Sequence, residues 1–168
     1  MTIILFAAAT ALTTLPVIAQ APLPRLENQV LLGGCRQGEC SWLRVISMSR
    51  VSRVPQGELR RIELRRGSSP DPGRRRPRIA WQPETRTNYV FCSTARPTYA
   101  FEEEDGGLIT HYLDLFDLAG YQQSSGQLYA RFCHGRALTT GRLRALGYRP
   151  GTRSEQIEGG SPEDLTRF

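Results

Sequence analysis

Arginine is the side chain of this sequence that is best suited to do chemistry. All 22 basic residues of the 168-residue chain are arginines, against 16 acidic residues. Guanidinium groups stay charged and bind phosphate or carboxylate through two parallel hydrogen bonds. Arginines concentrate in residues 60–78, where we predict an anion-binding set of Arg60, Arg61, Arg65, Arg74, Arg75, Arg76 and Arg78.

The charge is divided unevenly along the chain. Residues 36–96 hold fourteen arginines against five acidic residues, a net charge of +9, whereas residues 97–168 have a net charge of −3. Such a basic half attracts lipid headgroups, acidic sugars or acidic protein surfaces. The arginines are not interleaved with aromatic residues for base stacking, which argues against nucleic acid. The alternative is that the arginines serve solubility alone.

His111 is the candidate for acid–base catalysis, because it lies in an apolar run close to Asp114 and Asp117. A structural or surface role is more common for a lone histidine. His134 follows a cysteine directly, so we expect it beside a disulfide at the end of a strand. The sequence has no Gly-x-Ser-x-Gly motif, and two serines are expected in turns: Ser93 and Ser125. We therefore predict no catalytic residue.

Metal ligands are also scarce. The acidic run at residues 102–105 has the oxygen ligands that calcium prefers, but its spacing matches no calcium loop, so we interpret it as a solvated turn. The cysteines show no Cys-x-x-Cys spacing. We predict neither a metal nor a cofactor.

The beginning of the chain resembles an export signal. Residues 3–18 are almost entirely apolar, and small residues before position 20 predict cleavage after Ala19. This run is shorter than the roughly 20 residues of a spanning helix, and a lipobox-like segment ending at Cys35 lies too far from it. We predict a periplasmic or secreted protein with residues 1–19 as signal peptide, 20–147 as one domain and 148–168 as a flexible tail.

Four cysteines in an exported chain predict two disulfides, for which three pairings exist. We favour Cys35–Cys40, because Gly38 permits a tight turn between them, and Cys92–Cys133. The second bridge closes the longer loop and should stabilise the fold more.

Alternation of apolar and polar residues predicts a mostly β fold. We expect one antiparallel sheet or barrel-like domain of about six to eight strands, at residues 29–32, 41–54, 58–66, 79–81, 88–92, 98–101, 108–113 and 128–133. Residues 67–77 are predicted to be an exposed loop and 122–126 a turn. One short helix is predicted near residues 139–147, with Thr139 or Thr140 as its cap and Gly147 at its end. The alternative is an α+β fold, if residues 108–116 form a helix.

Residues 125–129, Ser-Gly-Gln-Leu-Tyr, resemble the Ser-Gly-x-x-Tyr motif of periplasmic inhibitors of C-type lysozyme. That family consists of small disulfide-linked β-barrels, and residues 89–92 are similar to its Tyr-x-Cys strand. The resemblance implies that Ser125 enters the lysozyme cleft. The chain departs from the family at residues 132–135, where a Trp-x-x-Gly segment should stand.

These observations favour a non-catalytic exported module that binds an envelope component or an acidic partner through its arginines. The alternatives are a lysozyme-inhibitor-like protein or a small secreted hydrolase. A cleft that joins His111 to a serine or a carboxylate would favour the hydrolase, whereas clustered arginines on a smooth surface would favour the binding module.

Overall fold

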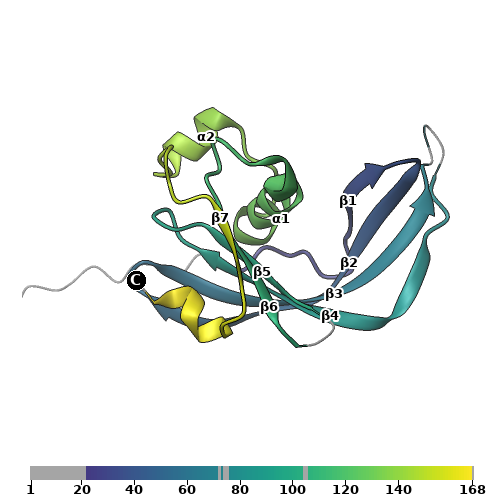
Figure 1. Ribbon diagram of the computed structural model, residues 1–168, viewed down its shortest axis with the longest axis horizontal. Helices are drawn as coiled ribbons and strands as arrows, with labels where there is room; N and C mark the ends of the chain where they lie inside the picture. Colours follow the sequence, from purple (N-terminus) through teal and green to yellow (C-terminus); the bar gives the residue numbers. More distant parts are fainter. Residues whose placement is uncertain (1–21, 72, 74–75, 104–105, 168) are drawn as a thin grey trace, which may run out of the picture.

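The computed structural model describes residues 22–71, 73, 76–103 and 106–167. Seven strands pair in sequence order into one antiparallel sheet, which confirms the predicted mostly β class (Figure 1). The strands are β1 (Val30–Arg36), β2 (Glu39–Val54), β3 (Gly57–Pro70), β4 (Ala80–Cys92), β5 (Thr98–Glu102), β6 (Leu108–Tyr112) and β7 (Glu155–Glu158). The predicted signal peptide lies outside the described residues, and none of the helices described is long and apolar enough to cross a membrane.

The two longest strands, β2 and β3, form a hairpin whose turn lies at residues 55–56, as the Pro-Gln-Gly sequence predicts. The loop predicted from residue 67 was wrong at its beginning, because β3 continues to Pro70, which pairs with Glu39. Gly67 permits this extension. A Cβ there would lie 2.6 Å from Ile79 and 2.7 Å from Trp81, so only glycine lets β4 pass this closely.

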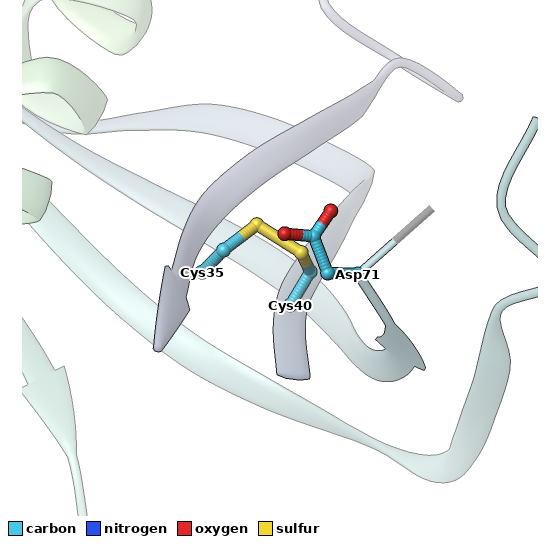
Figure 2. Close-up of side chains that lie close together, drawn as sticks. All are labelled: Cys35, Cys40 and Asp71. Carbon is cyan, nitrogen blue, oxygen red and sulfur yellow. A yellow bond between two sulfur atoms is a disulfide. The ribbon is translucent and has the colours of Figure 1, made fainter. Parts of the chain in front are cut away.

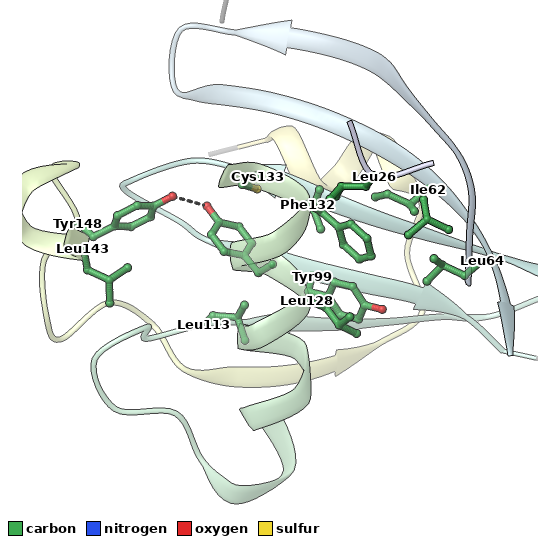
Figure 3. Close-up of a cluster of buried hydrophobic side chains, with 13 residues drawn as sticks. Leu26, Ile62, Leu64, Tyr99, Leu113, Leu128, Phe132, Cys133, Leu143 and Tyr148 are labelled. Atoms are coloured by element: carbon green, nitrogen blue, oxygen red, sulfur yellow. Dashed lines mark hydrogen bonds between the residues drawn. The ribbon is translucent and has the colours of Figure 1, made fainter. Parts of the chain in front are cut away.

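The sheet curls, and its concave face holds the main core (Figure 1). Alternation along β3 places Ile62 and Leu64 on this face, whereas Leu59 packs on the other. Figure 3 shows the concave core between the sheet and a helix; its fully buried members include Val45, Ile62, Val90, Leu113, Tyr129 and Phe132.

The helix over this face, α1 (Gln123–His134), corrects two predictions. Residues 122–126 were expected as a turn and 128–133 as a strand, and both expectations were wrong. The exposed residues of this helix, Gln123, Ser124, Gln127 and Arg131, recur at helical spacing, but residues 128–133 also alternate like a strand, and that alternation led to the wrong prediction. Gly135, with φ 73°, ends it in the left-handed conformation that glycine favours.

The predicted short helix is α2 (Thr140–Ala145). The Thr139 side chain accepts a hydrogen bond from the amide of Arg142, and Gly147 has φ 90° just after the last turn, so both expected caps are confirmed. The segment predicted as a strand from residue 108 is β6, so the α+β alternative for that segment was wrong.

Residues 148–168 were expected as a flexible tail, but the described part of this segment, residues 148–167, is built into the fold. Tyr148 is 4 % exposed in the main core, and β7 pairs with β6. The 3-10 helix η2 (Pro162–Thr166) starts with a capping box between Ser161 and Asp164. Its Leu165, 2 % exposed, covers a second core on the convex face of the sheet. Tyr148 and Leu165 therefore anchor this segment, although two isolated apolar residues show no periodic pattern in the sequence.

Both predicted disulfides are present. Cys35 and Cys40 face each other across the end of the β1–β2 hairpin. Cys92, at the end of β4, is bonded to Cys133 in α1. The second bridge thus ties the helix to the sheet, and not one strand to another as expected.

Candidate functional site

A groove of about 440 Å³ lies between the concave face of the sheet and the beginning of α1. Its floor is formed by β2–β6, and its wall by α1 and by the 3-10 helix η1 (Gly120–Gln122) that precedes it. A second hollow of about 590 Å³ shares Ser41 and Ser124 with it and continues toward the Cys35–Cys40 hairpin. The side chains that give the groove its chemistry are Arg66, Asn88, Tyr99, Phe101, His111, Tyr121 and Ser125.

Strand pairing explains why these residues meet. Asn88 lies opposite Phe101 and Tyr99 opposite His111, so the polar and aromatic side chains of three strands share one face. Arg66 follows Ile62 and Leu64 with the same period of two, at the point where β3 passes out of the core. The groove therefore begins where the apolar surface of the concave face ends.

Asn88 is a buried polar residue, 4 % exposed, in the floor of the groove. Its amide nitrogen donates to the hydroxyl of Tyr99, whose pKa is raised by burial to about 12, so this phenol stays protonated. Asn88 Oδ1 is buried and has no hydrogen-bond partner among the residues that the structure describes. A buried acceptor without a partner costs about 1–3 kcal/mol, which a ligand donor would relieve.

Arg66 is the cation of the groove. Its side chain is exposed and makes no hydrogen bond or ion pair with the described part of the chain. Three other arginines of β2 and β3 have carboxylate partners: Arg50 and Arg60 pair with Glu58, and Arg61 pairs with Glu63. Arg66 is therefore free to bind an anion that enters the groove.

His111 does not pair with Asp114 or Asp117. Its Nδ1 lies 2.7 Å from Ser125 Oγ, and its Nε2 lies 3.0 Å from Gln156 Oε1. Asp114 instead accepts hydrogen bonds from the backbone amides of Phe116 and Gly151. Burial lowers the pKa of His111 below its ordinary value, and the hydrogen bond to Gln156 opposes this shift in part. The structure thus brings His111 to a serine in a groove, the arrangement that would favour the hydrolase alternative.

The described members of the predicted anion-binding set do not form one surface. Arg60 is 6 % exposed on the concave face, whereas Arg61 and Arg65 lie on the opposite face of β3. Arg76 and Arg78 are exposed after the strand; two further members lie outside the described residues, Arg74 and Arg75. Successive side chains of a strand point to opposite faces of the sheet. Arg60 and Arg61 are therefore neighbours in sequence but lie on different faces.

Arg60 has a structural role that the sequence does not reveal. Its Nε donates to Glu58 at 2.7 Å, and its Nη1 donates to the carbonyl oxygens of Phe132 at 2.6 Å and Cys133 at 3.4 Å. These carbonyls end α1, where the helix dipole is negative and favours a cation. Burial raises the pKa of Glu58, but the hydrogen bonds and charges of Arg60 and Arg50 outweigh it and leave the pKa lowered.

His134 belongs to a buried hydrogen-bonded cluster rather than to the groove. Its Nε2 lies 2.7 Å from the hydroxyl of Tyr148, which lies 3.0 Å from the hydroxyl of Tyr129. Burial lowers the pKa of His134, and the nearby charge of Arg60 lowers it further. Burial also raises the pKa of Tyr148 to about 12. The cluster fixes the end of α1 against the chain that follows α2.

The sulfurs of Cys35 and Cys40 lie near the carboxylate of Asp71, a grouping with the spacing of metal ligands (Figure 2). The two sulfurs are bonded to each other, so they offer no thiolate to a metal. In the acidic turn, Glu104 and Asp105 lie outside the described residues, so the structure does not describe the arrangement of that turn.

The segment that resembles lysozyme inhibitors lies in α1. Ser125 is 5 % exposed, and the hydroxyl of Tyr129 donates to the carbonyl of Ser93 inside the core. In this position the hydroxyl of Ser125 lies 2.7 Å from His111 Nδ1. Ser93, expected in a turn, lies directly after β4 and accepts hydrogen bonds from the amides of Ala95 and Arg96.

Sequence reasoning placed Arg66 only beside the predicted anion-binding set, and it missed Asn88 and Gln156 as site residues. A usable signal was the period of two in β3 and β4, because Arg66 and Asn88 are polar positions in line with apolar ones. Gln156 gave no signal, since it lies in the expected tail.

Comparison with known protein families, characterised proteins and solved structures finds no match to this chain.

Proposed function

We propose that this protein is an exported binding protein whose groove takes a small acidic ligand of the cell envelope. The observation that carries the proposal is Arg66, a guanidinium without a partner among the described residues, at the rim of a groove with polar and aromatic walls. Guanidinium groups bind carboxylate and phosphate through paired hydrogen bonds, which fixes both the charge and the orientation of the ligand.

The rest of the groove narrows the class of ligand. Asn88 Oδ1 is an acceptor without a partner in the described structure, so it favours a ligand with a hydroxyl or amine donor. Phe101 and Tyr121 provide ring surfaces beside it, and rings of this kind pack against the apolar faces of sugars and other cyclic groups. An acidic sugar or a phosphorylated polar headgroup combines these features.

The test measures binding of glucuronate and of glycerol phosphate to the mature protein by calorimetry at low and at physiological salt. Arg66→Gln should weaken binding about tenfold or more, because a hydrogen bond to a charged group contributes about 1.5–3 kcal/mol. Arg53→Gln is the matched control: it removes the same charge from an exposed arginine of β2 that does not line the groove.

Three outcomes separate the possible surfaces. Loss of affinity in the Arg66 variant alone supports the groove. Equal loss in both variants would show that net charge, and not the groove, attracts the ligand. Loss only when Arg74, Arg75 and Arg76 are replaced by serine would move the site to the arginine-rich segment predicted from the sequence. If the wild-type protein binds neither ligand, the groove is not a site for small acidic molecules.

A further inference from the structure

A chain of hydrogen bonds runs from the edge of the sheet to the first turn of α1 and ends on a serine. On β7, Gln156 Nε2 donates to Glu158 Oε1 over 3.5 Å. Gln156 Oε1 lies 3.0 Å from His111 Nε2, and His111 Nδ1 lies 2.7 Å from Ser125 Oγ. Three separate elements therefore bring four polar side chains into one line.

The donors and acceptors of this chain agree with one direction of proton sharing, which the Gln156 variant described below tests. The carboxylate of Glu158 only accepts, so the nitrogen of the Gln156 amide faces it and the amide oxygen faces His111. That oxygen also only accepts, so the imidazole carries its proton on Nε2. The lone pair of Nδ1 is then left to accept the hydroxyl proton of Ser125. A serine that donates to an imidazole lone pair is the arrangement of an activated nucleophile.

Packing holds the imidazole in this position. Its ring makes edge contacts with Phe101 at 5.7 Å and with Tyr121 at 5.6 Å between ring centroids. His111 and Ser125 are each 5 % exposed, and both line the groove. Ser125 lies in the first turn of α1, whose positive end favours negative charge that develops nearby. The serine is thus fixed and oriented, and it lines the groove.

We propose that Ser125, activated by His111, is the nucleophile of an esterase site that acts on small acyl esters bound in the groove. This activity does not depend on the binding of an anion at Arg66. Gln156 is a positioning residue, because it fixes the tautomer of His111 and does not contact the ester.

The reaction balances with water as the only co-reactant. Ser125 Oγ adds to the carbonyl carbon of the ester, and its proton passes to His111 Nδ1. The bond to the leaving alkoxide breaks, and the alkoxide takes that proton from His111 and departs as an alcohol. A water molecule then gives a proton to His111 and attacks the acyl group on Ser125. The carboxylic acid is released, and the proton returns to Ser125 Oγ.

The neutral Gln156 predicts a slow enzyme. A carboxylate in its place would stabilise the imidazolium that forms during each step, whereas an amide only orients the ring. With an ester whose alcohol leaves readily, acylation needs less help from His111 than deacylation by water does, so the acyl group on Ser125 should accumulate and be detectable independently of turnover.

The experiment incubates the mature protein with p-nitrophenyl acetate, follows release of nitrophenolate and maps the acetyl group by peptide mass spectrometry. We expect acetylation of Ser125 and nitrophenolate release that Ser125→Ala abolishes. Ser124→Ala is the matched control, because this neighbouring serine also borders the groove but makes its hydrogen bond to the carbonyl of Gly33. It should react like the wild type.

Gln156→Leu tests the positioning role without touching the nucleophile or the base. Gln156 is exposed on the last strand, so the variant should fold, and its reaction should slow at least tenfold. Nitrogen NMR shifts of the His111 ring should show the proton on Nε2 in the wild type and a mixture of tautomers in this variant.

The proposal is overturned if the folded wild-type protein is not acetylated at Ser125, or if Ser125→Ala releases nitrophenolate equally fast. Equal rates in Gln156→Leu would overturn the assigned tautomer. Calorimetry of the wild-type protein with glucuronate measures ligand binding without any ester chemistry, so failure of this activity and failure of the proposed ligand binding are separate results.

Discussion

Replacing Arg60 with methionine should destabilise the fold strongly, although the sequence places this arginine in an apparently solvated basic run. Methionine keeps much of the length and apolar volume of the arginine side chain but removes its charge and its hydrogen bonds. The variant leaves Glu58, which is 9 % exposed, and the carbonyl oxygens of Phe132 and Cys133 without this donor.

The size of the stability loss depends on which partners Glu58 keeps in the variant. Removal of one partner from a buried ion pair costs about 3–5 kcal/mol, because it leaves the other charge uncompensated. Glu58 keeps a hydrogen bond of 2.6 Å to Arg50, which places the cost near the lower end of that range. We therefore expect the free energy of unfolding to fall by about 3 kcal/mol. In a domain of this size, the melting temperature should then fall by roughly 6–12 °C.

The assay is chemical denaturation followed by circular dichroism at pH 7, with the disulfides intact. Arg61→Met is the matched control: the neighbouring side chain is half exposed and pairs with Glu63 on the other face, so its loss should cost no more than about 1 kcal/mol. The double variant Glu58→Gln with Arg60→Met should recover part of the loss, because no carboxylate is left buried alone. If the Arg60 and Arg61 variants lose equal stability, Arg60 does not join the helix to the sheet and our reasoning is refuted.

Removal of the Cys92–Cys133 disulfide should lower the free energy of unfolding by about 4 kcal/mol on the chain-entropy model, and removal of Cys35–Cys40 by about 2 kcal/mol, because the bridges span 41 and 5 residues. Chemical denaturation of the two double-alanine variants measures both losses. Gly57→Ala should destabilise the fold by about 1–3 kcal/mol, since the new Cβ would lie 2.6 Å from a backbone carbonyl oxygen of β4. The Cβ of Gly141→Ala in α2 meets open space, so this variant should be neutral or stabilising, and thermal melting compares the two. Because the pKa of His134 is lower in the folded state, the unfolded state binds more protons, so stability should fall as the pH drops below about 6.5. His134→Gln should reduce this slope between pH 7 and pH 5 in denaturation midpoints, and an unchanged slope would contradict the assignment.

The sequence determined the parts of this protein that depend on local pattern. Alternation in residues 58–66 and 98–101, the turn before Gly57 and the caps of α2 each act within a few residues, and the structure has them where the pattern predicts. The disulfide pairing also followed, because one pair was close enough in sequence to close a hairpin and left only one partner for the other.

Tertiary structure decided which face of each strand is covered, and this decided the candidate site. Arg60 and Arg61 are adjacent in sequence, yet one anchors the end of α1 and the other is exposed on the opposite face, because the helix covers only the concave side. Helix α1 was missed because residues 128–133 alternate like a strand, although its exposed residues Gln123, Ser124, Gln127 and Arg131 lie at helical spacing. Ser125 lies 14 residues and Gln156 lies 45 residues after His111 in the sequence. The three side chains meet only through strand pairing and helix packing. Residue types alone could name these side chains as candidates, but only the curled sheet and the helix docked on it made them neighbours.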